Sequence, residues 1–504
     1  MKRLTHSLIV MLFLAVIAAS AYAGGAQEQK GRMLQVVLSG NPDTLDPQKT
    51  SGTLTFQVDR SIYDTLVEPD ENGRIIGDLA QSWEVSSDNL TWTFHLRHGV
   101  KFQNGDQFTS RDVKATLDRA RDPATASPNA SEYASIKSID TPDEYTVVLH
   151  LSQPYAPLLA TLASGWSAIL PASLIAKNHD FAADPVGTGP FIFRKWVRDN
   201  EIVLARNPDY WMAGHPLLAG VVFRIITEHA IQVQGLISGQ IDIDYLLNKE
   251  DLGLLTKGSG ATYKTELTSL VLVLAMNDSR PPFDNLKVRQ AINYAIDKQS
   301  ALDVAYGGGK VIGTFMDYSN PYYEELSNLY PYDPAKARQL LASAGVSVDR
   351  PLDLVLPQNY GPHVKAGEIY QQMLEKVGLK VKIRLVDWST WLSSVYKGGN
   401  YDMTVIGHTG KLDPNGRLSG FGTGTSYVHW NDPEVAALIT QARQTVGFDA
   451  RKAIYDKVLR IMGQQVPMVF VGTPYRYIGL RTNVSGFRID PSLDTFDFRY
   501  TELK

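Results

Sequence analysis

Two segments of the chain carry residues suited to binding a small polar solute. Trp388 comes directly after a predicted strand that ends at Val386, and the loop 407–414 comes directly after another that ends at Ile406. Solutes bound by α/β proteins lie outside the carboxyl ends of strands, in clefts whose walls mix aromatic rings with a few polar groups. The sequence therefore predicts that both segments line a binding cleft. Asp413 is the only acid in the loop, and it fits either a ligand contact or a turn beside its proline.

Catalytic motifs are missing from the sequence, which contains no HExxH, GxSxG or Walker pattern. The run 307–310, Gly-Gly-Gly-Lys, has the wrong spacing for a phosphate loop, and no serine or threonine follows it. We therefore predict a binding protein and not an enzyme, with no catalytic residue, no cofactor and no metal. A hydrolase that uses two of the 53 Asp and Glu residues is the alternative class. A periplasmic chaperone or the partner of a sensor is a third.

The composition is that of a folded chain with more than one lobe. Hydrophobic residues make up 44% and charged residues 20%, which are ordinary globular values and exclude a largely disordered chain. A length of 504 residues exceeds one ordinary core, so two or three lobes are expected. The formal charge of −4 offers no basic face for phosphate backbones, so nucleic acid is not an expected partner. The chain has no cysteine, and therefore no disulfide and no thiolate.

The first 23 residues have the pattern of a signal peptide. A basic head over 1–3 precedes an apolar run over 8–19, and the triplet 21–23, Ala-Tyr-Ala, has the small-x-small form of a cleavage site. The apolar run is too short to span a bilayer. We therefore expect cleavage near Ala23 and a periplasmic mature protein. Because no cysteine is available to carry a lipid, we do not expect a lipoprotein.

The elements predicted around the two segments are those of a mixed α/β protein. A strand over 352–356, a helix over 364–377 and a strand over 381–385 form a βαβ unit, which ends just before Trp388. Two further strands are predicted at the ends of the chain, over 33–39 and 467–471. The residues predicted to cap helices are Thr109, Asp333, Asp432 and Asp449.

Several segments together resemble family 5 of the bacterial extracellular solute-binding proteins, the oligopeptide-, dipeptide- and nickel-binding group. The segments occur in the family's order and cover nearly the whole chain after the signal peptide. They are Leu-Ala-Gln-Ser-Trp over 79–83, Trp-Thr-Phe-His-Leu-Arg over 92–97, Gly-Val-Lys-Phe over 99–102, Val-Gly-Thr-Gly-Pro over 186–190, Arg-Asn-Pro-Asp-Tyr-Trp over 206–211, Pro-Phe-Asp-Asn over 282–285 and Tyr-Asp-Pro-Ala-Lys-Ala over 332–337.

The resemblance implies a periplasmic-binding-protein-like α/β fold of the cluster C type, with two lobes joined by a hinge and an extra inserted domain. Two crossing segments would join the lobes, and lobe III would close over the ligand by a hinge motion. Lobe I would be discontinuous, because domain II is inserted into it. The expected parts are the signal peptide over 1–23, lobe I over 24–60, 174–270 and 479–504, domain II over 61–173 and lobe III over 271–478.

The resemblance also implies which residues meet the ligand. Peptide-binding members hold the peptide's α-ammonium with an aspartate in the loop 407–414, but the matching place here falls on Gly410 or Lys411. A lysine would repel an ammonium, and a charge pair is what makes such a grip strong. Asp413 is the alternative partner if the loop follows a different path. The candidate ligand-binding residues are therefore Trp388, His408, Gly410, Lys411, Asp413 and, from their position in the family alone, Thr53, Tyr133 and His363.

The function implied is the capture of an oligopeptide, or of a similar elongated polar solute, for an ABC importer. Family relatives also bind oligosaccharides, opine-like conjugates or nickel chelates. These alternatives stay open, because an aromatic platform such as Trp388 suits the face of a sugar as well as a peptide side chain. The expected partners are the solute and the permease subunits in the inner membrane, and the protein is expected to be a monomer.

Overall fold

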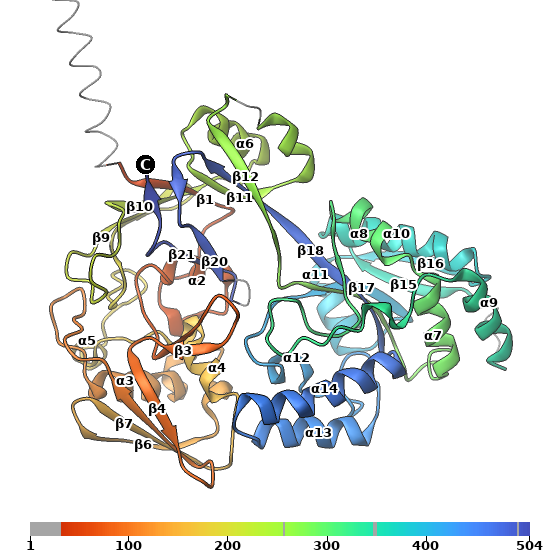
Figure 1. The fold of residues 1–504 in the computed structure, drawn as a ribbon, viewed down its shortest axis with the longest axis horizontal. Helices are drawn as coiled ribbons and strands as arrows, with labels where there is room; N and C mark the ends of the chain where they lie inside the picture. The colour runs from red at the N-terminus through yellow and green to blue at the C-terminus, as the bar shows by residue number, and fades with distance from the viewer. Residues whose placement is uncertain (1–31, 256–257, 346–349, 491–492) are drawn as a thin grey trace, which may run out of the picture.

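The computed structural model describes residues 32–255, 258–345, 350–490 and 493–504 (Figure 1). The predicted signal peptide over 1–23 and its cleavage site lie outside these residues. Among the residues described, no helix combines the length and the apolar character that crossing a membrane requires. The chain forms lobe I and lobe III, which lie next to each other, and a smaller domain II beneath lobe I in the view of Figure 1.

One twelve-stranded sheet runs through both lobes. In addition to the strands of its main path, β12 (Ala261–Leu267) and β14 (Gly309–Val311) pair with β18. The order along the path is β16 (Val381–Val386), β15 (Leu352–Pro357), β17 (Met403–His408), β13 (Val271–Met276), β18 (Met468–Arg481), β11 (Ile243–Leu247), β1 (Leu34–Leu38), β10 (Gly220–Ile225), β9 (Glu201–Arg206) and β8 (Phe191–Val197).

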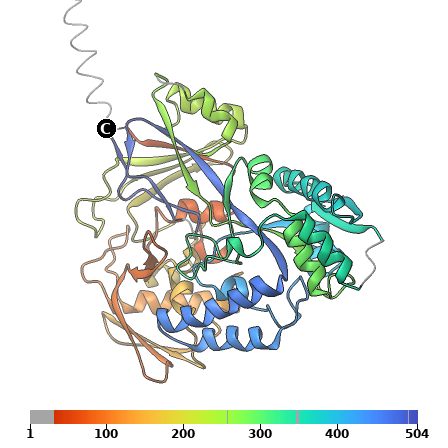
Figure 2. The ribbon, with the colours of Figure 1, turned by 45° about the vertical axis from the view of Figure 1, so that its right-hand side comes forward.

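The long strand β18 belongs to both lobes. Its first part, 468–472, pairs with β13 of lobe III, and its last part, 475–481, pairs with β12 of lobe I. Figures 1 and 2 show β18 crossing from one lobe to the other. The second connection is the short link 268–270, which joins β12 to β13. These two segments are where the chain passes between the lobes.

Lobe III is a three-layer α/β unit built on a sheet that is buried on both faces. Successive residues of β13 enter two different apolar clusters: Leu272 and Leu274 join one, and Val271 and Val273 join the other. Each cluster is covered by helices. The first face carries α7 (Leu286–Ala295), α8 (Lys298–Ala305), α9 (Pro334–Ser343) and α10 (Gly361–Glu375), and the second carries α12 (Asn415–Leu418), α13 (Pro433–Gln444), α14 (Phe448–Gln465) and a π-helical turn, Trp391–Lys397, that continues α11 (Trp388–Thr390).

Domain II is built on a four-stranded antiparallel sheet. Trp92, Phe94 and Leu96 alternate on one face of a central strand and are at most 2% exposed, because a period of two places them all toward the core. Thr109 and Asp112 form a capping box at the start of α3. The elements are β2 (Val67–Pro69), β3 (Ile75–Gly77), β4 (Ala80–Val85), β5 (Thr91–Leu96), α3 (Ser110–Arg121), β6 (Ile136–Asp143), β7 (Thr146–Leu151), α4 (Leu158–Ala163) and α5 (Ala172–Ile175).

Lobe I gathers segments from both ends of the chain. β1 pairs in parallel with β10 and β11, and an apolar cluster joins residues of these strands to aromatic rings of the C-terminal tail such as Phe496. The remaining elements of this lobe are α2 (Thr53–Asp59), α6 (His229–Ser238), β19 (Val484–Ser485), β20 (Arg488–Asp490), β21 (Thr495–Asp497) and β22 (Glu502–Leu503).

Domain II and lobe III also touch each other, on the side of the cleft away from β18. The amide of Ala156 donates to the carbonyl oxygen of Arg443 at 2.8 Å. The guanidinium of Arg74 lies 5.3 Å from the ring centroid of Phe448. Leu412 of lobe III is 8% exposed and packs into the core of domain II. The space between the lobes is therefore bounded on one side by the connecting strands and on the other by these contacts.

The predicted fold class and the βαβ unit are confirmed, because β15, α10 and β16 follow in that order and the two strands are parallel. Two local predictions need correction. Asp449 does not cap its helix, since α14 starts one residue earlier and has Gly447 at the cap position. The strand predicted over 467–471 extends to Arg481, because it continues into the other lobe. The predicted boundaries of the three parts stay a prediction.

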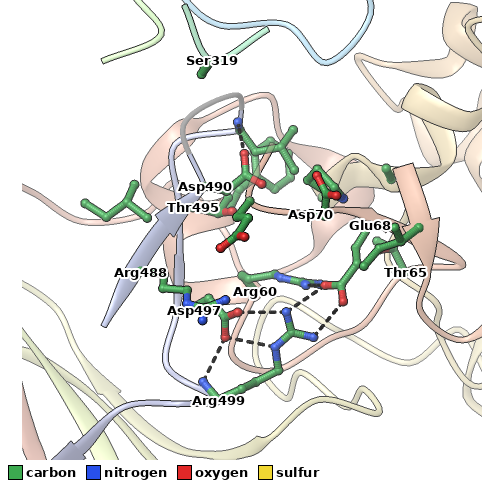
Figure 3. A pocket seen from close by; sticks show the side chains of 18 of the residues that line it. Arg60, Thr65, Glu68, Asp70, Ser319, Arg488, Asp490, Thr495, Asp497 and Arg499 are labelled. Carbon is green, nitrogen blue, oxygen red and sulfur yellow. Dashed lines mark hydrogen bonds and ion pairs between the residues drawn. The ribbon is translucent and has the colours of Figure 1, made fainter. Parts of the chain in front are cut away.

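A buried ion-pair network ties the C-terminal tail to domain II. Arg499 donates to both carboxylate oxygens of Glu68, at 3.1 and 2.8 Å, and to Asp497 at 2.8 Å (Figure 3). Arg60 also pairs with Glu68. Burial alone would raise the pKa of the Glu68 and Asp497 carboxyl groups. The guanidinium groups of Arg60 and Arg499 instead hold both pKa values below their usual range.

Replacing Arg499 with methionine should lower the free energy of unfolding by about 3 kcal/mol, because buried carboxylates lose their counter-charge. Equilibrium urea unfolding at pH 7 measures this. Since Glu68 and Asp497 have lowered pKa values in the folded chain, their contribution is present at neutral pH and is lost as the pH falls through those values. The difference between wild type and Arg499→Met should therefore shrink in acid. Arg488→Met, at an exposed arginine of the same tail, is the control and should change stability little.

Candidate functional site: the cleft between the lobes

The carboxyl ends of three parallel strands meet at one edge of the lobe III sheet. β15 pairs in parallel with β16 and β17, and the register places Pro357 opposite Val386. His408, at the end of β17, lies opposite Val271, the first residue of β13 after the inter-lobe link. The edge that carries Trp388 and His408 is therefore the edge beside the connection between the lobes, where α/β proteins bind their ligands.

An aromatic surface forms at this edge. The rings of Trp388 and Trp391 are stacked, with centroids 5.0 Å apart and 4° between their planes. Trp391 is 2% exposed and donates its indole N–H to Thr404 Oγ1 at 3.0 Å, so it belongs to the core. Trp388 is half-buried and meets the ring of Tyr360, which is 40% exposed, edge-on at 5.2 Å. Trp388 and Tyr360 thus offer a face on which an apolar part of a solute can pack.

His408 is held as a neutral imidazole. Its Nε2 lies 2.9 Å from the hydroxyl of Tyr427, and its ring meets Phe315 edge-on at 4.9 Å. Burial, with smaller contributions from Arg417 and His363, lowers the pKa of His408 to about 3. At physiological pH this side chain therefore carries no charge. In the part of the chain that the structure describes, no group of three or more His, Asp and Glu side chains is placed to hold a metal ion.

A cavity of about 560 Å³ lies between lobe III on one side and domain II with lobe I on the other. It brings together Thr53, at the start of α2, and Gly410, Lys411 and Asp413 from the loop of lobe III. These are residues that the sequence selected from places far apart in the chain. The cavity also has an aromatic wall that sequence reasoning missed, formed by Phe56, Tyr155 and Trp166.

Lys411 brings a positive charge to this cavity, where Glu132 in the facing wall acts on it without a direct ion pair. Its side chain reaches solvent, yet the surrounding cleft walls desolvate the ammonium and lower its pKa; Arg417 lowers it further, and Glu132 across the cleft opposes the shift. Within the described ranges, no salt bridge or hydrogen bond engages the Lys411 ammonium. An anionic group of a solute would supply the direct ion-pair partner that Glu132, across the cleft, does not.

A second cavity of about 800 Å³ continues the first. The two have Phe56, Gly165, Leu493 and Thr495 in common in their walls. In Figure 3, Ser319 of lobe III lies above the second cavity, and Thr495 and the network around Arg499 lie below Ser319. Sequence reasoning missed this cavity, because its walls come from segments as far apart as residues 68 and 499 and no local motif joins them.

Comparison with known proteins identifies the family of the chain. The family model described as "Bacterial extracellular solute-binding proteins, family 5 Middle" matches residues 74–428. The chain belongs to this family. The family 5 protein described here is 31% identical to Di/tripeptide-binding protein 1 of Pseudomonas aeruginosa over 488 residues, which cover 90% of the chain and 91% of that relative.

Solved structures agree with the family 5 fold. The structure of AgaA from A. tumefacien R10, in complex with agropinic acid, matches with a TM-score of 0.74 and 32% identity over 94% of this chain and 99% of that one. The structure of DppA from Helicobacter pylori, in complex with the peptide STSA, matches with a TM-score of 0.76 and 27% identity over 95% of this chain and 99% of that one.

Asp413 of this family 5 protein has a protein partner. Arg451 donates to both carboxylate oxygens, at 2.7 and 3.0 Å, and both side chains are buried. The amide of Asn415 also donates to Asp413 at 2.8 Å, which closes the turn. Because its charge is already matched by Arg451, the carboxylate is not available as the principal partner of a ligand ammonium. The geometry therefore favours the turn role of Asp413, and its role as an ammonium partner stays a prediction.

Tyr133 and His363 lie behind the cleft walls. Tyr133 is 1% exposed, and its hydroxyl is 2.6 Å from Ser167 Oγ. His363 is 7% exposed, with its Nδ1 2.8 Å from the hydroxyl of Tyr306, and burial lowers its pKa to about 4. Neither residue lines the two cavities. Tyr133 also donates to the carbonyl oxygen of Trp166, which lines the first cavity. That Tyr133 and His363 meet the ligand stays a prediction.

Asp413→Asn should lower the free energy of unfolding by about 3 kcal/mol, since it leaves a buried guanidinium without its carboxylate. Urea unfolding of the solute-free protein measures the effect. Asp449→Asn removes an exposed carboxylate from the same helical layer and should change stability little. Equal stability of Asp413→Asn and wild type would contradict a structural role for this ion pair.

Proposed function

We propose that this family 5 protein is the extracytoplasmic solute-binding subunit of an ABC importer and captures a short peptide in the cleft between its lobes. The observation that carries the proposal is the cleft itself. Two continuous cavities, of about 560 and 800 Å³, have walls from both lobes, and the lobes are joined by two narrow segments. A solute that touched both walls would favour closure and would be enclosed by it.

The relatives support the choice of a peptide. One is named for di- and tripeptides, and a solved relative holds the peptide STSA. The complex of AgaA with agropinic acid keeps an opine-like conjugate as the second candidate. Both candidates carry a carboxylate, which is the group that the unpaired Lys411 would attract in the cleft. Trp388 and Tyr360 would receive an apolar part of the solute when lobe III closes.

The remaining parts of the proposal follow from the same role. The permease subunits of the importer would receive the solute, the protein would act as a monomer, and it would catalyse no reaction. The N-terminal pattern supports cleavage near Ala23 and release into the periplasm without a lipid. N-terminal sequencing of protein recovered from the periplasmic fraction should return a residue near Gly24. A sequence starting at Met1, or recovery with membranes alone, would contradict this.

Trialanine should stabilise the protein and compact it. At a hundredfold excess over the dissociation constant, binding adds about 2.7 kcal/mol to the free energy of unfolding. The protein, stripped of cellular solutes by unfolding and refolding, is melted with trialanine and with maltotriose, and small-angle scattering records the radius of gyration. A higher melting temperature and a smaller radius with trialanine are expected. Stabilisation by maltotriose alone would replace the peptide by a sugar, and the proposal for peptides would be withdrawn.

Lys411→Glu should weaken the binding of trialanine at least tenfold, which is about 1.4 kcal/mol, because it places a carboxylate where the peptide's own carboxylate would lie. Calorimetric titration measures the affinity. The matched control is Lys397→Glu, the same change at an exposed lysine of lobe III outside both cavities. If the two variants bind trialanine equally well, Lys411 does not face the solute.

A further inference from the structure

The two cavities of the cleft meet at a neck. Three segments of the chain form it, because each contributes residues to the first wall, to the second wall and, where it crosses from one to the other, to both. Along α2 and the turn after it, Thr53 lines the first cavity, Tyr63 lines the second, and Phe56 between them lines both. The residues common to both walls, which define the neck, are Phe56, Gly165, Leu493 and Thr495.

The ring of Phe56 is the largest side chain of the neck, and it is closely packed. It meets the ring of Trp166 edge-on, with centroids 5.9 Å apart and 65° between the two planes. It also lies against the backbone of Gly165, where an added Cβ would come within 2.5 Å of the ring atom Cδ1. Glycine at position 165 therefore leaves the space that the ring fills. Because Phe56 is 8% exposed, its neighbours hold the ring in this place.

The walls on the two sides of the neck differ in charge. Lys411 lines the first cavity, and no salt bridge engages its ammonium among the described residues. The carboxylates in the wall of the second cavity, which include Glu68, Asp70 and Glu71, outnumber its basic side chains. A carboxylate of the solute is therefore favoured in the first cavity and disfavoured in the second. A solute held in this way reaches the second cavity only by extending through the neck.

Each cavity alone is large enough for one small solute. Their volumes of about 560 and 800 Å³ both fall within the range of roughly 300–1,000 Å³ that small-molecule sites have. A solute of two or three residues thus has room without passing the neck. A longer one must pass the ring of Phe56, and interior side chains have few voids into which they can move aside.

We propose that Phe56 limits the length of the solute by dividing the cleft into two compartments at the neck. A short solute is received in the first compartment, whereas a longer one must displace the ring from its packing against Gly165 and Trp166. With alanine at position 56 the neck is wider and the two compartments become one. The inference rests on the function proposed above insofar as it treats the cleft as the binding site, and it narrows the solute to a short one.

Titration with alanine peptides of increasing length tests the division. Calorimetry on the full mature chain, stripped of cellular solutes, gives the affinity at each length from dialanine to hexaalanine. Wild type should bind hexaalanine at least tenfold more weakly than trialanine. In Phe56→Ala the ratio of the hexaalanine affinity to the trialanine affinity should rise at least tenfold, whereas a loss of stability or of apolar contact common to all lengths would leave this ratio unchanged. Phe193→Ala is the matched control, because it makes the same change at a half-buried phenylalanine of lobe I outside both cavities.

A second series, from maltose to maltohexaose, separates this inference from the proposed function. If no peptide binds and Phe56→Ala shifts the sugar series toward longer chains, the division at Phe56 stands and the peptide assignment fails. If peptides bind and the ratio is the same in Phe56→Ala and wild type, or wild type binds hexaalanine as tightly as trialanine, the division is wrong and the peptide assignment stands. If neither series binds wild type, both are overturned. Should Phe56→Ala fail to fold, an unchanged ratio in Phe56→Leu overturns the inference equally.

Discussion

The cleft depends on one constraint, which is that a single strand completes the sheets of both lobes. β18 is hydrogen-bonded to β13 over its first residues and to β11 and β12 over its last, so each end is held in the ladder of a different lobe. Gly472, at the end of the first part, is packed so closely that an added Cβ would lie 2.5 Å from a methyl carbon of Leu302. Residues 472–474 also pair with β14, and the pairing with β12 begins at Tyr475. Rotation of the lobes must therefore be absorbed where β18 passes from Pro474 to Tyr475 and in the link 268–270.

Charge is distributed over the walls of the cleft in two ways. Where a charge positions the chain it is paired within the protein, as in the contacts of Arg499 with Glu68 and of Arg451 with Asp413. Lys411 differs, because it lines a cavity and no salt bridge or hydrogen bond engages its ammonium among the described residues. Ion pairs between buried charges fix the arrangement of the walls. A charge without an ion-pair partner in the protein can instead pair with a group of opposite charge on the solute.

The fold could be predicted from the sequence where local signals agree with the tertiary context. The alternation around Trp92 and the capping box at Thr109 depend on residues only a few positions apart in the sequence. Both predictions are confirmed. The site could be predicted in part, since the carboxyl ends of parallel strands meet at one edge and bring Trp388 toward His408. The rest depends on partners that are distant in the sequence. Asp413 meets Arg451 of α14, 38 residues away in the sequence, and no local motif records such a contact.

The contact of Leu412 with domain II has a kinetic consequence. This side chain follows Lys411 directly in the loop of lobe III, and it is buried in the core of domain II. Parting the two would return a leucine to water at a cost of about 2 kcal/mol, so this contact opposes the separation of lobe III from domain II. Solute enters through the open population, so the rate of capture scales with that fraction. A smaller side chain at position 412 would therefore speed both entry and escape and would alter the residence time of the solute more than its equilibrium contacts.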